Sequence, residues 1–250
     1  MTIQLIPVGG LPLVKPGDNI PEMITAALNG TDVKDNDVFV IASTIISKAE
    51  GQIHDLRSIC PSEEAEELSL RTGKDPRLCE VILRNSRKVI KVGDGPLITQ
   101  TPHGFICASS GVDTSNIAGD TNIVATLPLD PDASARSIRM ALEASLGKKI
   151  VVLISDTHGR PFRSGAIGVC IGLSGMDPFY CYKGEKDLYG YELRASIINR
   201  ADEITSAADM VMGQSNTGYP VVIVRGSTYF KSEDARAVDI VREEAKDLFR

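Results

Sequence analysis

The main indication of the fold is the stretch KIVVLISDTHGRPFRSGAIGVCIGLSG, residues 149–175. Two apolar segments, 149–156 and 165–175, flank a short polar connection. The first segment predicts a buried strand that ends in an acid, and the second predicts a glycine-rich strand in which backbones approach closely. This second strand and the strand PVVIVRG, 220–226, are apolar on both faces and need cover on each side, which a homodimer that extends or packs a sheet would provide.

Working outward, the apolar and β-branched patterns predict further strands, and the capping signals predict helices. The strands are expected at 2–8, 37–44 and 219–226, with shorter strand-like stretches at 88–95 and 104–111. The helices are expected at 21–29, 61–73, 76–87, 130–147 and 193–213, the last as one long helix or two abutting ones. In the helix at 61–73, Ser62 serves as N-cap and Gly73 as C-cap. The charged tail, 232–250, is expected to be helical.

This order of elements lacks a regular alternation of strand and helix. It therefore favours an α+β fold, with mixed and antiparallel sheets and flanking helices, over a doubly wound α/β fold. The 250 residues suit one unit spanning 1–250, built as a single large domain or as two modest lobes. Neither a phosphate-binding loop of the form GxxxxGK[ST] nor a dinucleotide-binding GxGxxG after the first strand is present, so the fold is predicted to be neither a P-loop nor a Rossmann fold.

Composition excludes several classes of partner. The net charge is -6, aromatic residues make up 5% and tryptophan is absent, which argues against binding to nucleic acid. No apolar run approaches the roughly 20 residues that span a bilayer, and the N-terminus does not resemble a signal peptide. The five cysteines form no C-x-x-C pair and are expected to be reduced thiols. A cytoplasmic protein without a membrane partner is expected.

Two segments carry carboxylates in places that suit a cation. The turn SGVDTSN, 110–116, presents Asp113 after an apolar strand, and a carboxylate there suits a hard cation; the alternative is an Asx-turn that satisfies only its own backbone. The connection ISDTHGRPFRSG, 154–165, places Asp156 and Thr157 at a strand end, with Arg160 and Arg163 close behind. These groups suit a Mg²⁺ or Mn²⁺ site beside a phosphate or carboxylate, or else a surface salt-bridge turn.

Other segments suit an anion. Lys48, in SKAEG at 47–51, could reach a phosphate or could be a solvated lysine. The polar glycine loop MGQSNTGYP, 212–220, could offer backbone N–H groups to an anion or could be a plain connection. His158 is interpreted as a packing or hydrogen-bonding residue, because no second histidine lies at ligand spacing.

Taken in order, seven segments resemble the F420-0:gamma-glutamyl ligases. They are GLPLVKPGD (10–18), VFVIASTIISKAEG (38–51), SGVDTSN (110–116), ISDTHGRPFRSG (154–165), KDLYG (186–190), ADEITSAADMVMG (201–213) and PVVIVRG (220–226). Each motif is weak alone, but seven in sequence with sensible spacing form a strong signal. The resemblance implies the unusual α+β fold of that family and a homodimer.

The resemblance also assigns site residues. Nucleotide-binding positions fall on Leu11, Pro12, Leu13, Val14, Ser43, Thr44, Lys48, Asn116, Met212, Gly213, Gln214, Ser215, Asn216, Thr217, Gly218 and Tyr219. Metal positions fall on Asp113, Asp156, Thr157 and Gln214, for two Mg²⁺ or Mn²⁺ ions, with K⁺ as a further cation. Three departures are visible: Gln214 stands where glutamate is expected, SSG at 109–111 replaces NAG, and His158 replaces phenylalanine or asparagine.

The implied reaction joins L-glutamate to F420-0, and also to F420-1, at the expense of GTP. The cofactor carboxylate attacks the γ-phosphate, GDP leaves, and the glutamate amine attacks the acyl phosphate. Lys48 would stabilise phosphates, and Arg160 and Arg163 would orient a carboxylate or phosphate. Two other classes stay open: a metal-dependent phosphohydrolase acting on a nucleotide or phosphate ester, and a GTP-binding regulator without catalysis.

Overall fold

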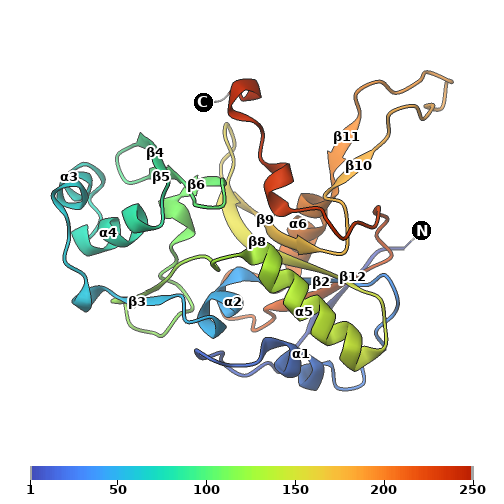
Figure 1. Cartoon of the computed structure of the whole chain (residues 1–250), viewed down its shortest axis with the longest axis horizontal. Coiled ribbons are helices and arrows are strands. Elements are labelled where there is room, and N and C mark those ends of the chain that lie inside the picture. The colour runs from blue at the N-terminus through green and yellow to red at the C-terminus, as the bar shows by residue number, and fades with distance from the viewer. Residues whose placement is uncertain (1, 249–250) are drawn as a thin grey trace.

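The computed structural model describes residues 2–248 and is organised around one mixed five-stranded sheet (Figure 1). Its strands, in spatial order, are β1 (Gln4–Val8), β12 (Val221–Arg225), β2 (Val38–Ala42), β8 (Val151–Gly159) and β9 (Ala166–Ser174). Only β2 and β8 pair in parallel; the other neighbours are antiparallel. The predicted α+β class with mixed and antiparallel sheets is confirmed, and the architecture is neither a P-loop nor a Rossmann fold.

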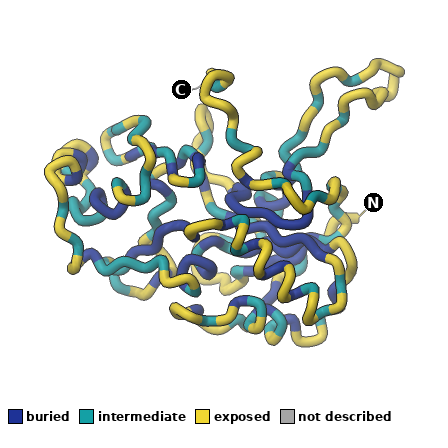
Figure 2. The backbone as a smooth tube through the Cα atoms, viewed as in Figure 1, coloured by how far each residue is buried: buried dark blue, intermediate teal, exposed yellow. Residues whose placement is uncertain are grey.

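Helices cover both faces of this sheet. Helices α1 (Ile20–Leu28) and α5 (Pro131–Leu146) lie on one face, and α6 (Arg200–Met212) lies on the other (Figure 1). The central strands are therefore buried over most of their length, as the dark band in Figure 2 shows. The cover that the apolar strands require is supplied within the chain.

Glycines in β9 permit the close approach of both helices. A Cβ at Gly172 would lie 2.6 Å from the backbone of Pro131 in α5, and one at Gly168 would lie 2.8 Å from the side chain of Asp209 in α6. In a regular strand, residues four apart lie on the same face of the sheet. These two glycines lie on opposite faces, because the β8–β9 register shifts between Ile154 and Ser155. This irregularity leaves Ile171 as an extra residue on β9.

A smaller lobe holds the segment between β2 and α5. It contains a three-stranded antiparallel sheet and two helices, and its buried residues form clusters separate from the main core. Its elements, together with the short helix that follows β2, are α2 (Ser43–Ala49), β3 (Ile53–Asp55), α3 (Glu63–Thr72), α4 (Pro76–Arg84), β4 (Lys88–Val92), β5 (Leu97–Gln100), β6 (Ile106–Ala108) and β7 (Ile123–Ala125). The predicted caps of α3 are confirmed: Ser62 accepts a hydrogen bond from the amide of Ala65, and Gly73 adopts the left-handed conformation.

A hairpin arm projects from the body between β9 and α6 (Figure 1). Its base is the strand pair β10 (Phe179–Cys181) and β11 (Ile197–Asn199). The prediction of helix from residue 193 is therefore wrong for 193–199. The helix starts at Arg200 because the Asn199 side chain accepts a hydrogen bond from the amide of Asp202 and caps it.

Other boundaries also differ from the expectation. The helix expected at 76–87 ends at Arg84, and the strand expected at 104–111 covers only Ile106–Ala108, because Ser109–Gly111 form a 3-10 helix. The strand expected at 37–44 ends at Ala42, and Ser43 and Thr44 begin α2. Instead of a continuous helix, the described part of the tail after Ser232 forms two short 3-10 helices, Ala237–Ile240 and Glu244–Lys246. No helix within residues 2–248 is both long and apolar enough to cross a lipid bilayer.

Candidate active site

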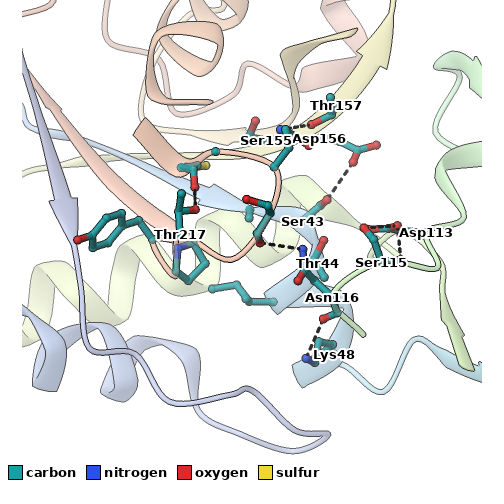
Figure 3. Close-up of a pocket in the computed structure, with 18 of the residues that line it drawn as sticks. Ser43, Thr44, Lys48, Asp113, Ser115, Asn116, Ser155, Asp156, Thr157 and Thr217 are labelled. Atoms are coloured by element: carbon teal, nitrogen blue, oxygen red, sulfur yellow. Dashed lines mark hydrogen bonds between the residues drawn. The ribbon is translucent and has the colours of Figure 1, made fainter. Parts of the chain in front are cut away.

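A cavity of about 590 Å³ opens where β2 ends beside the later part of β8. These strands are parallel neighbours, with Ala42 paired to Ser155, so the residues that follow Ala42 lie next to Ser155, Asp156 and Thr157 (Figure 3). The prediction that Asp156 and Thr157 stand at a strand end is wrong, because pairing with β9 continues β8 to Gly159. The cavity is lined by every residue to which the resemblance assigns a nucleotide or a metal. They are Leu11, Pro12, Leu13, Val14, Ser43, Thr44, Lys48, Asp113, Asn116, Asp156, Thr157 and 212–219.

Asp156 is held by contacts to both carboxylate oxygens. The Ser43 hydroxyl donates to Oδ1 at 3.2 Å, and Nε2 of His158 lies 2.9 Å from Oδ2. His158 is buried, with 4% of its surface exposed, and serves as a hydrogen-bonding residue, as its sequence context predicts. This pair of contacts restricts the rotation of the Asp156 side chain at the cavity wall.

Asp113 approaches from the smaller lobe. Its Oδ1 accepts hydrogen bonds from the amide of Ser115 at 2.7 Å and from the Ser115 hydroxyl at 2.8 Å. The Asx-turn that the sequence left as an alternative is therefore present, yet the residue also lines the cavity (Figure 3). One turn both satisfies its own backbone and presents a carboxylate.

Lys48 is buried, with 8% of its surface exposed, so the alternative of a solvated lysine is wrong. Its Nζ donates to the carbonyl oxygen of Asn116 at 3.2 Å (Figure 3), and burial lowers its pKa. Asn116 adopts a left-handed backbone with φ of 53° and donates from Nδ2 to the carbonyl of Ser215 at 3.3 Å. These contacts join three segments that are distant in sequence into one wall.

The loop 212–219, which includes Ser215, continues this wall. Thr217 donates from its hydroxyl to the carbonyl of Met212, and Gly213 adopts a φ of 67°. From Nε2, Gln214 donates to Thr157 Oγ1 at 3.1 Å and to Asp209 Oδ1 at 2.8 Å. Gln214 thus links the loop to β8 and to the end of α6.

Two arginines of the predicted site do not line this cavity. Arg160 follows the last residue of β8 and donates from Nε to the carbonyl of Gly159 at 3.1 Å, while Arg163 is exposed in the turn that follows. The cavity wall does include three polar residues that the sequence reading missed: Ser115, Ser155 and Asp209. Of these, Asp209 carries a sequence signal, because it stands on the last turn of a predicted helix directly before the polar glycine loop.

The comparisons with known proteins point the same way. The model of the F420-0:Gamma-glutamyl ligase family matches residues 10–226. The coenzyme F420:L-glutamate ligase of Methanothermobacter thermautotrophicus is 46% identical over 253 residues, covering 100% of both chains. Proteins of the same name are 45% identical in Methanocaldococcus jannaschii, covering 96% of this chain and 94% of that one, and 38% identical in Archaeoglobus fulgidus, covering 100% and 97%. The chain therefore belongs to the F420-0:gamma-glutamyl ligase family.

Proposed function

We propose that this protein joins L-glutamate to F420-0 through a γ-glutamyl amide, with GTP as the co-substrate. The observation that carries the proposal is the meeting of the family's separate motifs around one polar cavity. Addition of a second glutamate, to F420-1, belongs to the same proposal. The names of the relatives support the substrates glutamate and coenzyme F420.

The reaction proceeds through an acyl phosphate. An oxygen of the substrate's terminal carboxylate bonds to the γ-phosphorus, and the bond between that phosphorus and the β,γ-bridging oxygen breaks, releasing GDP. The glutamate amine then attacks the acyl carbon, loses a proton and displaces phosphate. Such transfers need in-line positioning and charge neutralisation more than covalent help from the protein.

The residues for nucleotide phosphates come from discontinuous segments. Lys48 lies against Asn116, and Asn116 contacts the 212–219 loop, so one cation and a polar loop border the same space. A lysine whose charge is partly desolvated interacts more strongly with a phosphate than a fully solvated one. We assign phosphate binding to Lys48, Asn116 and this loop, and assign the adjoining nucleotide contacts to Leu11–Val14, Ser43 and Thr44.

The donor set fits a hard divalent cation. Asp113, Asp156, Thr157 and Gln214 offer carboxylate, hydroxyl and amide oxygens, the ligands that Mg²⁺ and Mn²⁺ prefer. Within residues 2–248, no group of three or more His, Cys, Asp or Glu side chains is placed to hold a metal ion by itself. A cation held by one or two carboxylates keeps positions for phosphate oxygens and water, which is the common arrangement for Mg²⁺. Two such ions, when bound, would neutralise phosphate charge and polarise the transferred group.

Arg160 and Arg163 are proposed to orient a substrate carboxylate or phosphate. Both follow β8 directly, so they stand next to the strand that carries Asp156 and Thr157 although they lie outside the cavity wall. Arg160→Ala and Arg163→Ala should then raise the apparent KM for glutamate or F420-0 and leave the fold unchanged.

A homodimer is proposed on the evidence of the arm rather than of the sheet. The sequence argument for a dimer relied on apolar strands that α5 and α6 already cover. The arm instead exposes Leu188 at 101% and Tyr189 at 97% of their surfaces, within the KDLYG motif. Large apolar side chains at the tip of a projecting hairpin favour contact with a second chain.

The test is a phosphate-release assay with GTP, glutamate and F420-0, omitting each in turn, followed by mass spectrometry of the product. The ligase requires all three and yields products one or two glutamates heavier. Phosphate release without glutamate would favour a phosphohydrolase, and GTP binding without turnover would favour a regulator. Exchanging GTP for ATP, Mg²⁺ for Mn²⁺ and K⁺ for Na⁺ tests those preferences, and cell fractionation tests the proposed cytoplasmic location.

A further inference from the structure

A second cavity, of about 490 Å³, lies apart from the candidate active site. It is bordered by the smaller lobe, the start of α5, β9 and the segment that follows Ser232. Within residues 2–248 the two cavities share no wall residue, and they lie at opposite ends of β6: Phe105, directly before this strand, lines the second cavity, and Ala108, its last residue, lines the first. The volume falls in the range of roughly 300 to 1,000 Å³ that is typical of small-molecule sites.

Much of the wall of this second cavity is apolar. Phe105 and Ile171 are buried, whereas Leu129 and Val238 keep 75% and 44% of their surfaces exposed. Val238 belongs to the 3-10 helix Ala237–Ile240, which packs against β9. A ligand with an apolar body would remove part of this exposed surface from water, which favours binding.

His103 carries an acceptor that has no donor. Its Nε2 lies 3.0 Å from the carbonyl oxygen of Leu129. Because a carbonyl oxygen only accepts, Nε2 bears the hydrogen, and Nδ1 of the neutral ring is an acceptor. This Nδ1 is buried, and no residue from 2 to 248 donates a hydrogen bond to it. Buried polar atoms in folded proteins nearly always have a partner, so this atom favours an occupant of the cavity with an N–H or O–H donor.

Arg87 supplies a cation to the wall. Each carboxylate of the described wall already has a partner: Asp130 and Asp132 accept from backbone amides, and Glu243 and Glu244 pair with lysines. The exposed guanidinium of Arg87, by contrast, has no described hydrogen bond or ion pair with any residue from 2 to 248. An arginine in this position suits a carboxylate or a phosphate, because its planar guanidinium can donate two parallel hydrogen bonds to either.

We propose that this cavity is a second binding site, for a small organic anion that has an apolar body and an N–H or O–H group. Arg87 binds the anionic group, Nδ1 of His103 accepts from the donor, and Phe105, Ile171 and Val238 contact the apolar body. No residue of the proposed reaction lies in this wall, so the second site and the proposed function can fail independently.

The test uses 4-hydroxybenzoate, which has a carboxylate, an aromatic ring and a hydroxyl group, with the full-length protein. Backbone amide shifts in two-dimensional 1H–15N NMR report both the place and the affinity of binding. We expect shifts at Gly104, Phe105 and Val238, and none at Gly213 or Gly218, which line the first cavity.

Two matched compounds each lack one feature of this probe. Benzoate has no hydroxyl group, and phenol has no carboxylate. Each should bind about tenfold more weakly than 4-hydroxybenzoate, because each loses one hydrogen bond to a buried or charged partner.

Two variants connect each feature of the ligand to one side chain. Arg87→Gln removes the charge, so 4-hydroxybenzoate should lose about tenfold in affinity while phenol binds as before. His103→Phe keeps a ring and removes the acceptor, so 4-hydroxybenzoate should bind no more tightly than benzoate, whose affinity stays at the wild-type value. Arg71→Gln is the matched control, because it makes the same change at an exposed arginine of α3 outside the cavity wall and should leave all three affinities unchanged.

Several results would overturn the inference. Shifts confined to the first cavity, or no shifts with any of the three compounds, would show that the second cavity does not bind this class of ligand. Equal affinities of the three compounds for the wild type would show that neither Arg87 nor His103 recognises the ligand. Equal losses in Arg87→Gln and Arg71→Gln would assign the effect to the net charge of the protein rather than to the site.

Discussion

At the residue scale, burial of Lys48 strengthens the attraction of its ammonium for anions. The only described hydrogen bond of its side chain is to the backbone carbonyl of Asn116, and its ammonium is partly desolvated by the surrounding wall. A partly desolvated ammonium is attracted more strongly to a phosphate, because Coulomb attraction grows as water is removed.

Replacement of Lys48 should therefore affect the nucleotide first. We expect Lys48→Ala to raise the apparent KM for GTP by at least about tenfold, which corresponds to the roughly 1.4 kcal/mol of one charged hydrogen bond, with a smaller effect on the KM for glutamate. Steady-state kinetics with each substrate varied in turn measures both constants. Lys91→Ala, an exposed lysine on β4, is the control. Equal effects on the two KM values would argue against phosphate contact.

Asp156 is the residue whose charge the reaction should need most. Asp156→Asn retains an oxygen that can accept from Ser43 but loses the negative charge that a hard cation prefers. We expect kcat to fall by at least about 100-fold, because metal assistance contributes several kcal/mol to such transfers. Circular dichroism and thermal unfolding should show a folded protein. A variant with near-normal kcat would remove Asp156 from the proposed cation site.

At the scale of elements, a side chain of α4 in the smaller lobe holds the start of the neighbouring helix α3. Glu80 in α4 accepts hydrogen bonds from the amide and the hydroxyl of Ser62, at 2.9 and 2.6 Å, and from Arg84 Nε at 2.8 Å. The hydrogen bonds from Ser62, followed by the one from Arg84, lower the pKa of Glu80 to about 2. The carboxylate thus fixes the start of α3 from the neighbouring helix.

This arrangement predicts a defined dependence on pH. Because the folded pKa lies below the ordinary value of 4.5, the stabilisation is complete above pH 4.5 and is lost as the pH falls from 4.5 toward 2. We expect Glu80→Gln to lower the free energy of unfolding at pH 7 by about 1 to 3 kcal/mol. The difference from the wild type should shrink across that acid range. Urea titrations at several pH values measure it, with Glu67→Gln on exposed α3 surface as control. A difference that does not change with pH would contradict this account.

At the scale of the whole molecule, the arm carries two of the most exposed large apolar side chains of the described residues. Asp187 accepts from the amides of Tyr189 and Tyr191, at 2.8 and 2.9 Å, and so gives the tip a defined turn that presents Leu188 and Tyr189 outward. At the base, Tyr180 stacks on Phe230 with ring centroids 4.8 Å apart, and the Arg200 guanidinium lies over the Tyr180 ring. A tip with a fixed shape on an anchored base suits contact with a second chain.

The dimer should therefore depend on the tip. We expect light scattering of the wild type at micromolar concentration to give about twice the 26.9 kDa chain mass. The double variant Leu188→Ser, Tyr189→Ser should shift the mass toward 26.9 kDa, because an obligate interface of roughly 2,000 Å² relies on a few large apolar contacts. Lys183→Ser on the same arm is the control. A wild type that scatters as a single chain would refute the dimer, and full activity in a monomer would show that the site is complete without it.

Most of the local structure could be predicted from the amino-acid sequence. The strands at the core, the start of α1 and the caps of α3 were all predictable, since hydrophobic period, proline, serine and glycine act over a few neighbouring residues. The resemblance of seven motifs also predicted which residues line the cavity, because a family pattern records positions that meet in space.

The contacts between segments distant in sequence could not be predicted, because they depend on strand order and register. Asp209 reaches the cavity because the β8–β9 register places Gly168 beside Thr157, and neither residue reveals that pairing locally. Residues 193–199 look helical in sequence but lie in the arm, where Ile197 to Asn199 pair with β10 and tertiary pairing overrides local propensity. Arg160 lies outside the cavity wall for a similar reason: β8 continues to Gly159 and carries the following turn away from the site. Local sequence specifies the backbone conformation of a few neighbouring residues. Strand order and register specify which distant residues lie close together, and the site consists of such residues.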